Sequence, residues 1–201
     1  MKQYFIANPD IARNEQFLSF DYAGFPFRLT TTAGLFSYEK PDAASLLLID
    51  VMRKSLPPLA GNVLDLGCGY GLIGILMAKT HAAQHGFRLF MSDTNEIACT
   101  YAKKNAQAHH IPVTVIHSDG FAQINDKFNH ITLNPPIHAG KETMYRLYQE
   151  CADALLPNGT LYIVIQKKHG ALTTQNFLST IFKSITILHK HKGFYVLSCT
   201  C

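Results

Sequence analysis

The fold of this chain is decided by the stretch Val63-Leu64-Asp65-Leu66-Gly67-Cys68-Gly69-Tyr70-Gly71-Leu72-Ile73-Gly74. A short apolar run passes through three alternating glycines into apolar residues at helical spacing, which predicts a buried parallel strand, a tight turn and a helix start. Glycine reaches positive φ without strain and lets the backbone approach a ligand. The free N–H groups at the helix start predict a site for an anionic group. A βα turn without a ligand is the alternative.

The same glycines carry a first indication of the ligand class. Gly69-x-Gly71-x-x-Gly74 matches the fingerprint of dinucleotide-binding proteins. Asp93 lies about 20 residues further on, where an acid that binds ribose is expected. Taken alone, this pattern predicts only a cofactor that contains adenosine.

Length and composition indicate one globular domain with a substantial core, since the chain has 201 residues and 47% of them are hydrophobic. No apolar run reaches the roughly 18 residues of a membrane span, so neither a span nor a signal peptide is expected. Five scattered cysteines without a Cys-x-x-Cys pair indicate reduced thiols in a cytoplasmic protein. His189 and His191 suggest polar strand ends rather than a metal site, because no cysteine or acid accompanies them at ligand spacing.

Positive charge is concentrated in the second half of the chain. Residues 101–201 hold 10 Lys and Arg residues against 5 Asp and Glu residues, and no acidic residue follows Asp153. Such a one-sided excess indicates a polyanionic partner such as RNA. A solvated basic edge explains the same charge equally well.

A β-hairpin is predicted ahead of the main domain. Two β-like runs, 16–22 and 25–31, are joined through Ala23-Gly24. Residues 1–14 are expected to be irregular, with a turn at Asn8-Pro9-Asp10. We therefore divide the chain into an N-terminal hairpin extension, 1–32, and a main domain, 33–201.

Strands and helices alternate along the main domain, which predicts a parallel sheet with helices on both faces. The last two strands are joined by only Lys190-His191-Lys192, so they must be antiparallel to each other. Helices are expected at 41–55, 71–83, 95–108, 141–155 and 172–182, and strands at 62–66, 87–92, 112–116, 128–133, 159–166, 184–189 and 193–199.

Ligands of open α/β sheets bind beyond the carboxyl ends of the strands, and three acids occupy those positions here. Asp65 ends the first strand, where a carboxylate suits the ammonium group of a methionine moiety better than a diphosphate. Asp93 can accept both hydroxyls of a ribose, and Asp119 can accept from an adenine amino group. Each acid has an alternative role as a helix N-cap or turn residue. The predicted cofactor-binding residues are Asp65, Gly67, Cys68, Gly69, Gly71, Asp93, Thr94, Asp119, Gly120 and Asn134.

The fourth strand ends in Asn134-Pro135-Pro136-Ile137. Two prolines fix φ and so aim the Asn134 side chain and the Pro135 carbonyl at one point. Both groups are hydrogen-bond acceptors, which can hold the two hydrogens of a planar –NH2 group and direct its lone pair at an electrophile. The methyl group of S-adenosylmethionine needs no strong base, so positioning supplies most of the catalysis. Asn134 and Pro135 are the predicted catalytic residues; a rigid turn is the alternative.

These motifs resemble those of class I S-adenosylmethionine-dependent methyltransferases that modify exocyclic or amide nitrogens. More narrowly, three segments resemble the small-subunit ribosomal RNA guanine-N2 methyltransferases, and the likeness covers about residues 4–200. The segments are Gly34-Leu35-Phe36-Ser37, Asn134-Pro135-Pro136-Ile137-His138-Ala139-Gly140-Lys141 and Gln166-Lys167-Lys168-His169-Gly170-Ala171.

That resemblance implies a Rossmann-like fold with a seven-stranded, mostly parallel sheet, an antiparallel last strand and helices on both faces. It also implies that Gly67, Gly69, Gly71 and Asp93 hold S-adenosylmethionine. Asn134 and Pro135 would hold the target amine.

One position departs from the pattern, because many amine methyltransferases carry a base-stacking aromatic residue where this chain has Ile137. Phe36 or Tyr145 would then supply the stacking. Some family members bind RNA through a duplicated N-terminal domain, and the basic half of this chain, including Arg146, would do that work here. The predicted substrate-binding residues are Phe36, Pro136, Ile137, Lys141, Lys167 and Lys168.

The sequence therefore predicts a cytoplasmic RNA N-methyltransferase that acts on a guanine amino group in ribosomal RNA or the small ribosomal subunit, without a metal or a membrane. One alternative is a protein glutamine-amide methyltransferase, against which Ile137 and the basic tail argue. An NAD-dependent oxidoreductase and an inactive RNA-binding module are the other two.

Overall fold

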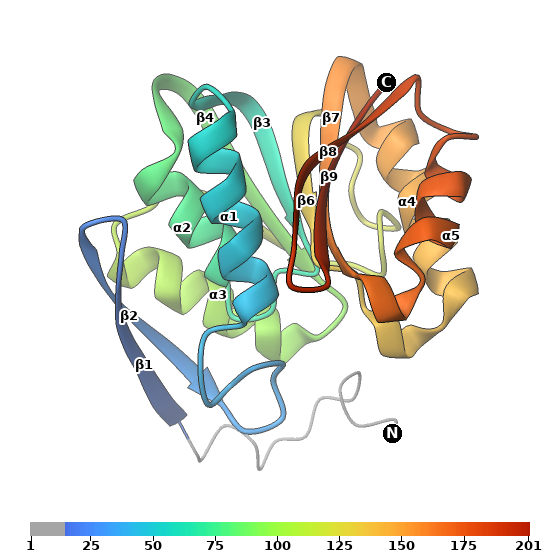
Figure 1. Ribbon diagram of the computed structural model, residues 1–201. Coiled ribbons are helices and arrows are strands. Elements are labelled where there is room, and N and C mark those ends of the chain that lie inside the picture. Colours follow the sequence, from blue (N-terminus) through green and yellow to red (C-terminus); the bar gives the residue numbers. More distant parts are fainter. Residues whose placement is uncertain (1–14) are drawn as a thin grey trace.

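The computed structural model describes residues 15–201, so the irregular segment expected at 1–14 lies outside the described residues. Seven of the described strands form one sheet, in the order β5-β4-β3-β6-β7-β9-β8, and two more form a separate hairpin (Figure 1). The strands of the main sheet are β3 (Leu59–Leu66), β4 (Ala82–Asp93), β5 (Val113–His117), β6 (Phe128–Leu133), β7 (Leu155–Gln166), β8 (Ser184–His191) and β9 (Phe194–Thr200).

The direction of these strands confirms the predicted seven-stranded fold. β3 pairs in parallel with both β4 and β6, and the parallel pairing continues to β5 on one side and β7 on the other. β9 is antiparallel to both of its neighbours, β7 and β8. The last strand thus lies between β7 and β8. The parallel pairing of β5, β4, β3, β6 and β7 brings their carboxyl ends together at one edge of the sheet.

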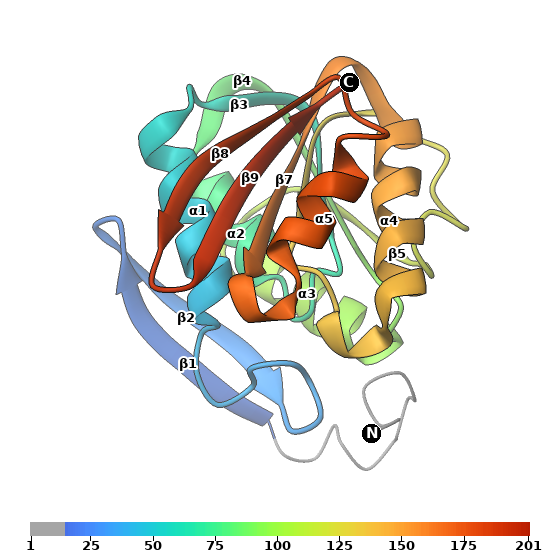
Figure 2. The same cartoon turned by 45° about the vertical axis from the view of Figure 1, so that its right-hand side comes forward.

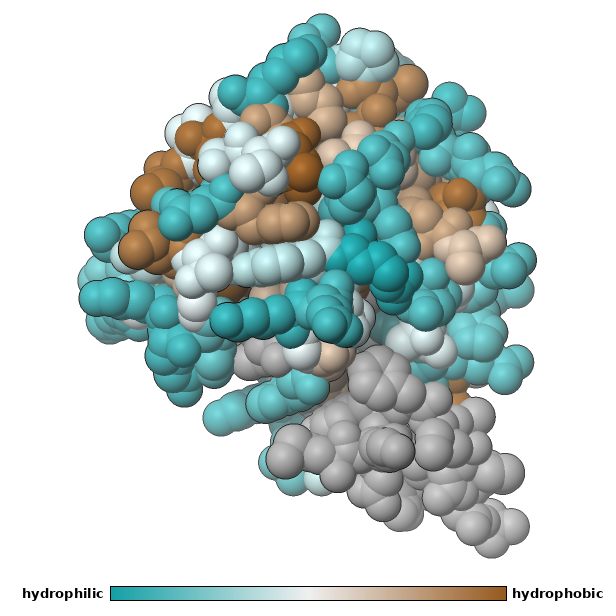
Figure 3. All heavy atoms as spheres, turned by 90° about the vertical axis from the view of Figure 1, so that its right-hand side faces the viewer, coloured by the Kyte–Doolittle hydropathy of each residue, from teal (hydrophilic) through white to brown (hydrophobic). Residues whose placement is uncertain are grey.

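Helices cover both faces of the sheet (Figures 1 and 2). α1 (Ala43–Ser55), α2 (Leu72–Thr80) and α3 (Glu96–Ala108) pack on one face, and α4 (Lys141–Ala154) and α5 (Ala171–Leu178) on the other. Val63 belongs to the first core and its neighbour Leu64 to the second, as expected where successive strand residues point to opposite faces. Figure 3 shows the side with α4 and α5, where hydrophilic side chains separate the hydrophobic patches. Two short 3-10 helices are η3 (Ile137–Ala139) and η4 (Lys167–His169).

The largest difference from the predicted boundaries is at the start of β4, which begins at Ala82 and not near residue 87, and α2 correspondingly ends at Thr80. Leu59 pairs with Ala82 ahead of a register shift at Gly61. Gly61 has a φ of 77°, and a Cβ there would overlap the Asn129 side chain, so only glycine fits this irregular pairing. Pairing with β3 thus extends β4 to residues 82 and 83, which the sequence pattern assigned to a helix.

The N-terminal hairpin of β1 (Glu15–Tyr22) and β2 (Phe25–Thr32) packs on α3. Phe27 and Leu29 are buried in the core on that side. The Asn105 side chain of α3 accepts a hydrogen bond from the Thr30 backbone N–H (2.7 Å) and donates to the carbonyls of Thr30 (2.8 Å) and Tyr70 (2.9 Å). One buried amide therefore ties the hairpin, α3 and the glycine loop together, and so fixes where the chain leaves the hairpin for α1.

Residues 15–201 contain no helix that is both long and apolar enough to cross a bilayer. In that same part of the chain, no group of three or more His, Cys, Asp or Glu side chains lies close enough to hold a metal ion. His189 and His191 lie on β8 with ring centroids 6.0 Å apart. The five cysteines are free thiols.

Candidate active site

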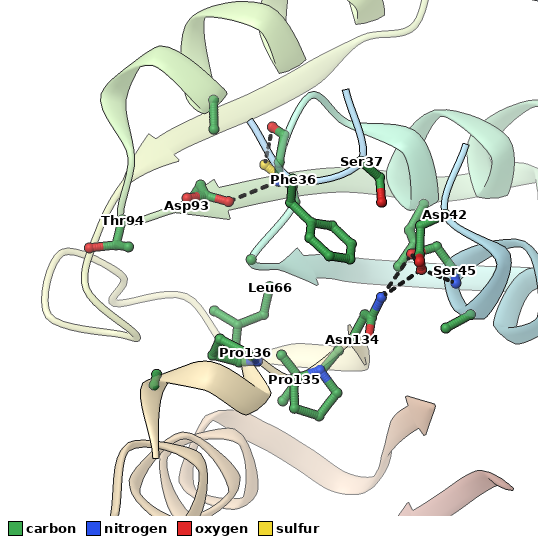
Figure 4. A pocket seen from close by; sticks show the side chains of 18 of the residues that line it. Phe36, Ser37, Asp42, Ser45, Leu66, Asp93, Thr94, Asn134, Pro135 and Pro136 are labelled. Atoms are coloured by element: carbon green, nitrogen blue, oxygen red, sulfur yellow. Dashed lines mark hydrogen bonds between the residues drawn. The ribbon is translucent and has the colours of Figure 1, made fainter. Parts of the chain in front are cut away.

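A cavity of about 490 Å³ opens at the carboxyl ends of β3, β4, β5 and β6 (Figure 4). Pockets of about 300 to 1,000 Å³ hold cofactor-sized ligands. The glycine loop after β3, the turns after β4 and β5 and the end of β6 supply its walls, and the loop at 34–37 and the start of α1 close it from the other side. Segments from both halves of the domain therefore share one cavity, at the place where open α/β sheets bind their ligands.

The three alternating glycines of the loop have different functions. Gly67 and Gly69 line the cavity with φ values of 70° and 55°, and a Cβ on either would meet no atom within 4 Å. Their backbone is open to a ligand. Gly71 (φ 91°) is not among the lining residues, and a Cβ there would lie 3.3 Å from the Ala102 Cα and 3.1 Å from the Ile75 side chain. Gly71 therefore allows close packing of α2 against α3, in place of the ligand contact that the sequence predicted.

Asp65 supports the glycine loop from below. Its side chain has no exposed surface, and its carboxylate accepts hydrogen bonds from the Gly74 N–H (2.8 Å) and the Thr132 hydroxyl (3.3 Å). Burial raises the pKa of the Asp65 carboxyl to about 7, although these two hydrogen bonds lower it. A carboxylate that is buried and bonded in this way does not contact a ligand in the cavity. The expected direct contact with an ammonium group is corrected to a role in holding the first turn of α2.

Asp93 lies in the cavity wall and is bonded to the glycine loop. Its two carboxylate oxygens accept the backbone N–H groups of Gly69 (2.8 Å) and Asn95 (2.9 Å). Burial raises the pKa of the Asp93 carboxyl, while these N–H groups lower it. Thr94 and Cys68, which were also predicted to bind the cofactor, line the same wall. The backbone of the loop therefore sets the position of the Asp93 carboxylate in the cavity wall.

Asp119 and Gly120 line the cavity beyond β5. The Asp119 side chain is 69% exposed and forms an ion pair with Arg146 of α4 at 2.6 Å. Arg146 also pairs with Glu150 at 2.8 Å, so its charge is already engaged with two acids. The structure therefore places Arg146 as a partner of Asp119 at the cavity edge, where the sequence had assigned it to RNA.

Asn134 directly follows β6, on the opposite wall, next to the buried Pro135. Its side-chain nitrogen donates hydrogen bonds to the Asp42 carboxylate (2.9 Å) and to the Ser45 hydroxyl (3.0 Å), which Figure 4 marks with dashed lines. Both partners come from the start of α1 and line the cavity. The sequence had placed Asp42 and Ser45 only within the helix expected at 41–55, so these two residues were missed as site residues. Their Asp-x-x-Ser spacing by itself signals no more than a cap.

Phe36 is the aromatic residue at the mouth of the cavity. Its side chain is 55% exposed although it lines the cavity, and Figure 4 shows its ring projecting into the space between Asp93 and Asn134. Tyr145, the other candidate for base stacking, packs instead against Phe177 with ring centroids 4.0 Å apart, and it is not among the lining residues. Of the two, Phe36 is thus the one available to a planar ligand.

The predicted substrate-binding residues occupy different parts of the rim. Pro136 lines the cavity, and Ile137 begins η3 directly after it. Lys141, Lys167 and Lys168 are exposed and lie outside the lining, next to lining residues such as His169. The structure therefore leaves the three lysines outside the cavity and open to solvent.

Comparison with known proteins points to one family. The family model described as methyltransferase small domain matches residues 26–198. The "Uncharacterized protein YbxB" of Bacillus subtilis is 34% identical over 199 residues, which cover 98% of this chain and 96% of that protein. A "Ribosomal RNA small subunit methyltransferase C" of Vibrio cholerae is 34% identical over 148 residues, covering 72% of this chain and 42% of that protein.

A solved structure agrees with this grouping. The T. thermophilus 16S rRNA N2 G1207 methyltransferase, determined in complex with AdoMet and guanosine, superimposes with a TM-score of 0.81 at 25% identity. The superposition covers 93% of this chain and 50% of that one. The chain thus spans nearly all of YbxB and about half the length of the ribosomal RNA methyltransferases that it matches. On the match over residues 26–198, the chain belongs to the methyltransferase small domain family.

Proposed function

We propose that this protein is an S-adenosylmethionine-dependent RNA N-methyltransferase that methylates the exocyclic N2 amine of a guanine in small-subunit ribosomal RNA. The observation that carries the proposal is the shared cavity, in which the glycine loop and Asp93 lie on one wall and Asn134 on the other. A ribosomal RNA substrate would place the enzyme in the cytoplasm. The V. cholerae and T. thermophilus relatives are named for ribosomal RNA methylation, which supports this substrate class.

The glycine-loop wall fits an adenosine-containing methyl donor. Gly67 and Gly69 present open backbone, and the Asp93 carboxylate lies beside them as an acceptor for ribose hydroxyls. Asp119 and Gly120, further along the wall, would contact the adenine. When bound, S-adenosylmethionine would supply an electrophilic methyl group that needs no strong base to activate its acceptor.

The Asn134 wall fits the group that accepts the methyl. The Asn134 amide oxygen and the Pro135 carbonyl would each accept one hydrogen of the target amine, which favours a pyramidal nitrogen and aims its lone pair across the cavity. The new N–C bond forms as the C–S bond breaks, and the amine releases one proton to solvent. Holding the nitrogen in line with the methyl group is the main catalytic contribution, because orientation alone can lower the barrier by about 7 to 11 kcal/mol.

Phe36 and the basic rim would hold the rest of the RNA. The exposed Phe36 ring offers a stacking surface for a flipped base, in a chain that has Ile137 after Asn-Pro-Pro. Base-aromatic stacking contributes about 1 to 3 kcal/mol per base. Lys141, Lys167 and Lys168 would contact phosphates outside the cavity.

The test is methyl transfer from radiolabelled S-adenosylmethionine to small ribosomal subunits, and to naked RNA, from cells that lack this protein. We expect label on one guanine, identified as N2-methylguanine by digestion and mass spectrometry. Label on ribosomal protein alone would replace the RNA proposal with the glutamine-amide alternative. Thermal stabilisation by NAD and not by S-adenosylmethionine would contradict the cofactor, because a ligand stabilises the fold that binds it.

A further inference from the structure

The Asn134 amide is held by two side chains that the catalytic motif does not contain. Its nitrogen donates to Asp42 Oδ2 at 2.9 Å and to Ser45 Oγ at 3.0 Å, across 92 and 89 residues of sequence. The two hydrogens of the amide therefore each have a partner. Among residues 15–201, no side chain or backbone group donates to the Asn134 oxygen, so this oxygen is the part of the amide available to a ligand.

The chemistry of the two partners determines which way the amide faces. An ionised carboxylate such as Asp42 only accepts hydrogen bonds, so it must face the –NH2 end of Asn134. The Ser45 hydroxyl donates its own hydrogen to Asp42 Oδ2 at 2.9 Å, which leaves its oxygen to accept from Asn134. Rotating the amide by 180° would place its oxygen against the Asp42 carboxylate. The network thus selects the orientation with the oxygen as the free acceptor.

The start of α1 holds both partners in place. Asp42 is the N-cap of the helix, and its Oδ2 atom also accepts the backbone N–H of Ser45 at 2.7 Å. Ser45 is 5% exposed, and one turn further on Leu48 and Ile49 are fully buried in the core. Because the body of α1 is anchored in this way, the Asp42 and Ser45 side chains form a fixed support for Asn134.

We propose that Asp42 and Ser45 are positioning residues for methyl transfer, which set the Asn134 amide so that its oxygen accepts from the target amine. The proposal deepens the proposed function and rests on it. Besides fixing the orientation, the carboxylate polarises the amide, since hydrogen bonds in a chain strengthen one another. The Asn134 oxygen thereby becomes a stronger acceptor for the substrate N–H.

Asp42→Gly tests the orientation at little cost to the helix, because glycine is tolerated at an N-cap better than other residues that lack a side-chain acceptor. The variant removes Asp42 Oδ2, the one atom that accepts from the Ser45 N–H, the Ser45 hydroxyl and the Asn134 –NH2 group. The Ser45 hydroxyl is then free to donate to the Asn134 oxygen, so the amide is no longer held in one orientation. We expect kcat to fall roughly 100-fold, as when one pre-set polar group at the reacting centre is removed. KM and the Kd for S-adenosylmethionine should change less than about threefold.

Three further variants separate positioning from stability. Ser45→Ala removes one of the two acceptors and should lower kcat roughly fivefold, as expected for one neutral hydrogen bond. Asp42→Gly in an Asn134→Ala background should cause no further loss, because the residue being oriented is gone. Asp50→Asn controls for the lost charge, since Asp50 lies on the same helix and pairs with Arg53 and Lys54, away from Asn134. It should leave kcat unchanged.

A measurement that does not depend on methyl transfer tests this proposal separately from the proposed function. The Asn134 side-chain –NH2 signals, identified in a ¹⁵N–¹H spectrum by their loss in Asn134→Ala, should show slow solvent exchange in the wild type. In Asp42→Gly they should shift and exchange faster, while in Asp50→Asn they should not move. Unmoved signals in Asp42→Gly, or wild-type kcat in that variant, would overturn the positioning role. A wild type that methylates no ribosomal RNA would instead remove the proposed function, with the spectra still deciding how Asn134 is held.

Discussion

On the glycine-loop side of the cavity, backbone N–H groups hold the carboxylates of Asp93, in the wall, and of Asp65, beneath the loop, where the Thr132 hydroxyl adds a longer bond. On the opposite wall, the Asn134 amide is held by the side chains of Asp42 and Ser45. The backbone partners of the first wall lie 9 and 24 residues away in the sequence, and the side-chain partners of the second lie 92 and 89 residues away. The first wall is formed by β3, the glycine loop and α2, together with the turn after the neighbouring strand β4. The second depends on how α1 docks against the end of β6.

This difference has a functional consequence. A backbone-held wall tolerates changes elsewhere in the domain, because the loop itself supplies the donors that position its acids. A side-chain-held wall can be changed by a single substitution in another element. Variants of the glycine-loop wall should therefore change mainly the affinity for the cofactor, and variants of the Asn134 wall should change mainly turnover.

The largest expected effect is on the side-chain-held wall. Asn134→Ala removes the acceptor for the target amine, and we expect turnover to fall by at least roughly 1,000-fold, the upper range for one pre-set polar group. The Kd for S-adenosylmethionine should change less than about threefold, because Asn134 lies opposite the glycine loop. Radiolabel transfer and calorimetry measure the two quantities. Asn176→Ala, an exposed asparagine of α5, is the control. Unchanged transfer would end the assignment of Asn134.

The next effect concerns the buried acid beneath the glycine loop. The Asp65 pKa is about 7, above the ordinary value of 3.8, because of burial. Between these two values the folded protein binds a proton that the unfolded chain has lost, so the free energy of unfolding decreases as the pH rises and levels off above about pH 7. The decrease due to Asp65 is at most about 4 kcal/mol.

Asp65→Asn removes this titration and keeps the shape of the side chain. Its free energy of unfolding, measured in urea from pH 4 to 8, should therefore rise relative to that of the wild type across that window. Asp126→Asn, at an exposed position, controls for the lost charge. A constant difference between Asp65→Asn and the wild type at all pH values would contradict the raised pKa.

On the backbone-held wall, Asp93→Ala should weaken S-adenosylmethionine binding by roughly 10-fold to 100-fold, which matches about 1.5 to 3 kcal/mol for hydrogen bonds to a charged group. Turnover at saturating cofactor should change far less, which is the reverse of Asn134→Ala. Asp93→Asn retains one acceptor for the Gly69 N–H, so its affinity for S-adenosylmethionine should lie between those of Asp93→Ala and the wild type. Equal affinities by calorimetry for Asp93→Ala and the wild type would remove Asp93 from the cofactor site.

The same contrast explains which parts of the molecule could be predicted from the sequence. The parallel sheet with an antiparallel last strand followed from the alternation of strands and helices, and the strand ends then led to the cavity wall that contains Asp93. Asp65 and Gly71 were predicted to contact the cofactor, whereas the structure buries both and leaves them out of the cavity lining. A motif shows that a residue is required but not whether it faces the ligand or the protein interior. Tertiary packing decides that, and here it directs both residues inward.

Asp42 and Ser45 could not be assigned from the sequence for a related reason. Their spacing specifies a helix cap, and their second partner becomes visible only when α1 is docked beside β6. Phe36 and Tyr145 were equal candidates for stacking until packing placed Tyr145 against Phe177. A local pattern thus identifies groups held by their own segment, and leaves out groups whose function depends on a distant one.

The smallest expected effect lies outside both walls, on the rim. Lys167 and Lys168 are exposed on η4, next to the lining residue His169. If they bind phosphates, reversing both charges (Lys167→Glu with Lys168→Glu) should reduce affinity for RNA roughly 10-fold at low salt. The slope of log K against log salt should become shallower by about 0.7 for each phosphate of single-stranded RNA that is no longer neutralised by a lysine.

Reversal of Lys54 and Lys79 makes the same change in net charge at the last turns of α1 and α2, the ends opposite to those that border the cavity, and should leave the slope unaltered. The Kd for S-adenosylmethionine should be the same in both double variants, because neither wall is touched. Equal slopes for the two double variants would show that the RNA senses only net charge. The rim would then be a solvated edge, and recognition would have to come from Phe36 and the Asn134 wall.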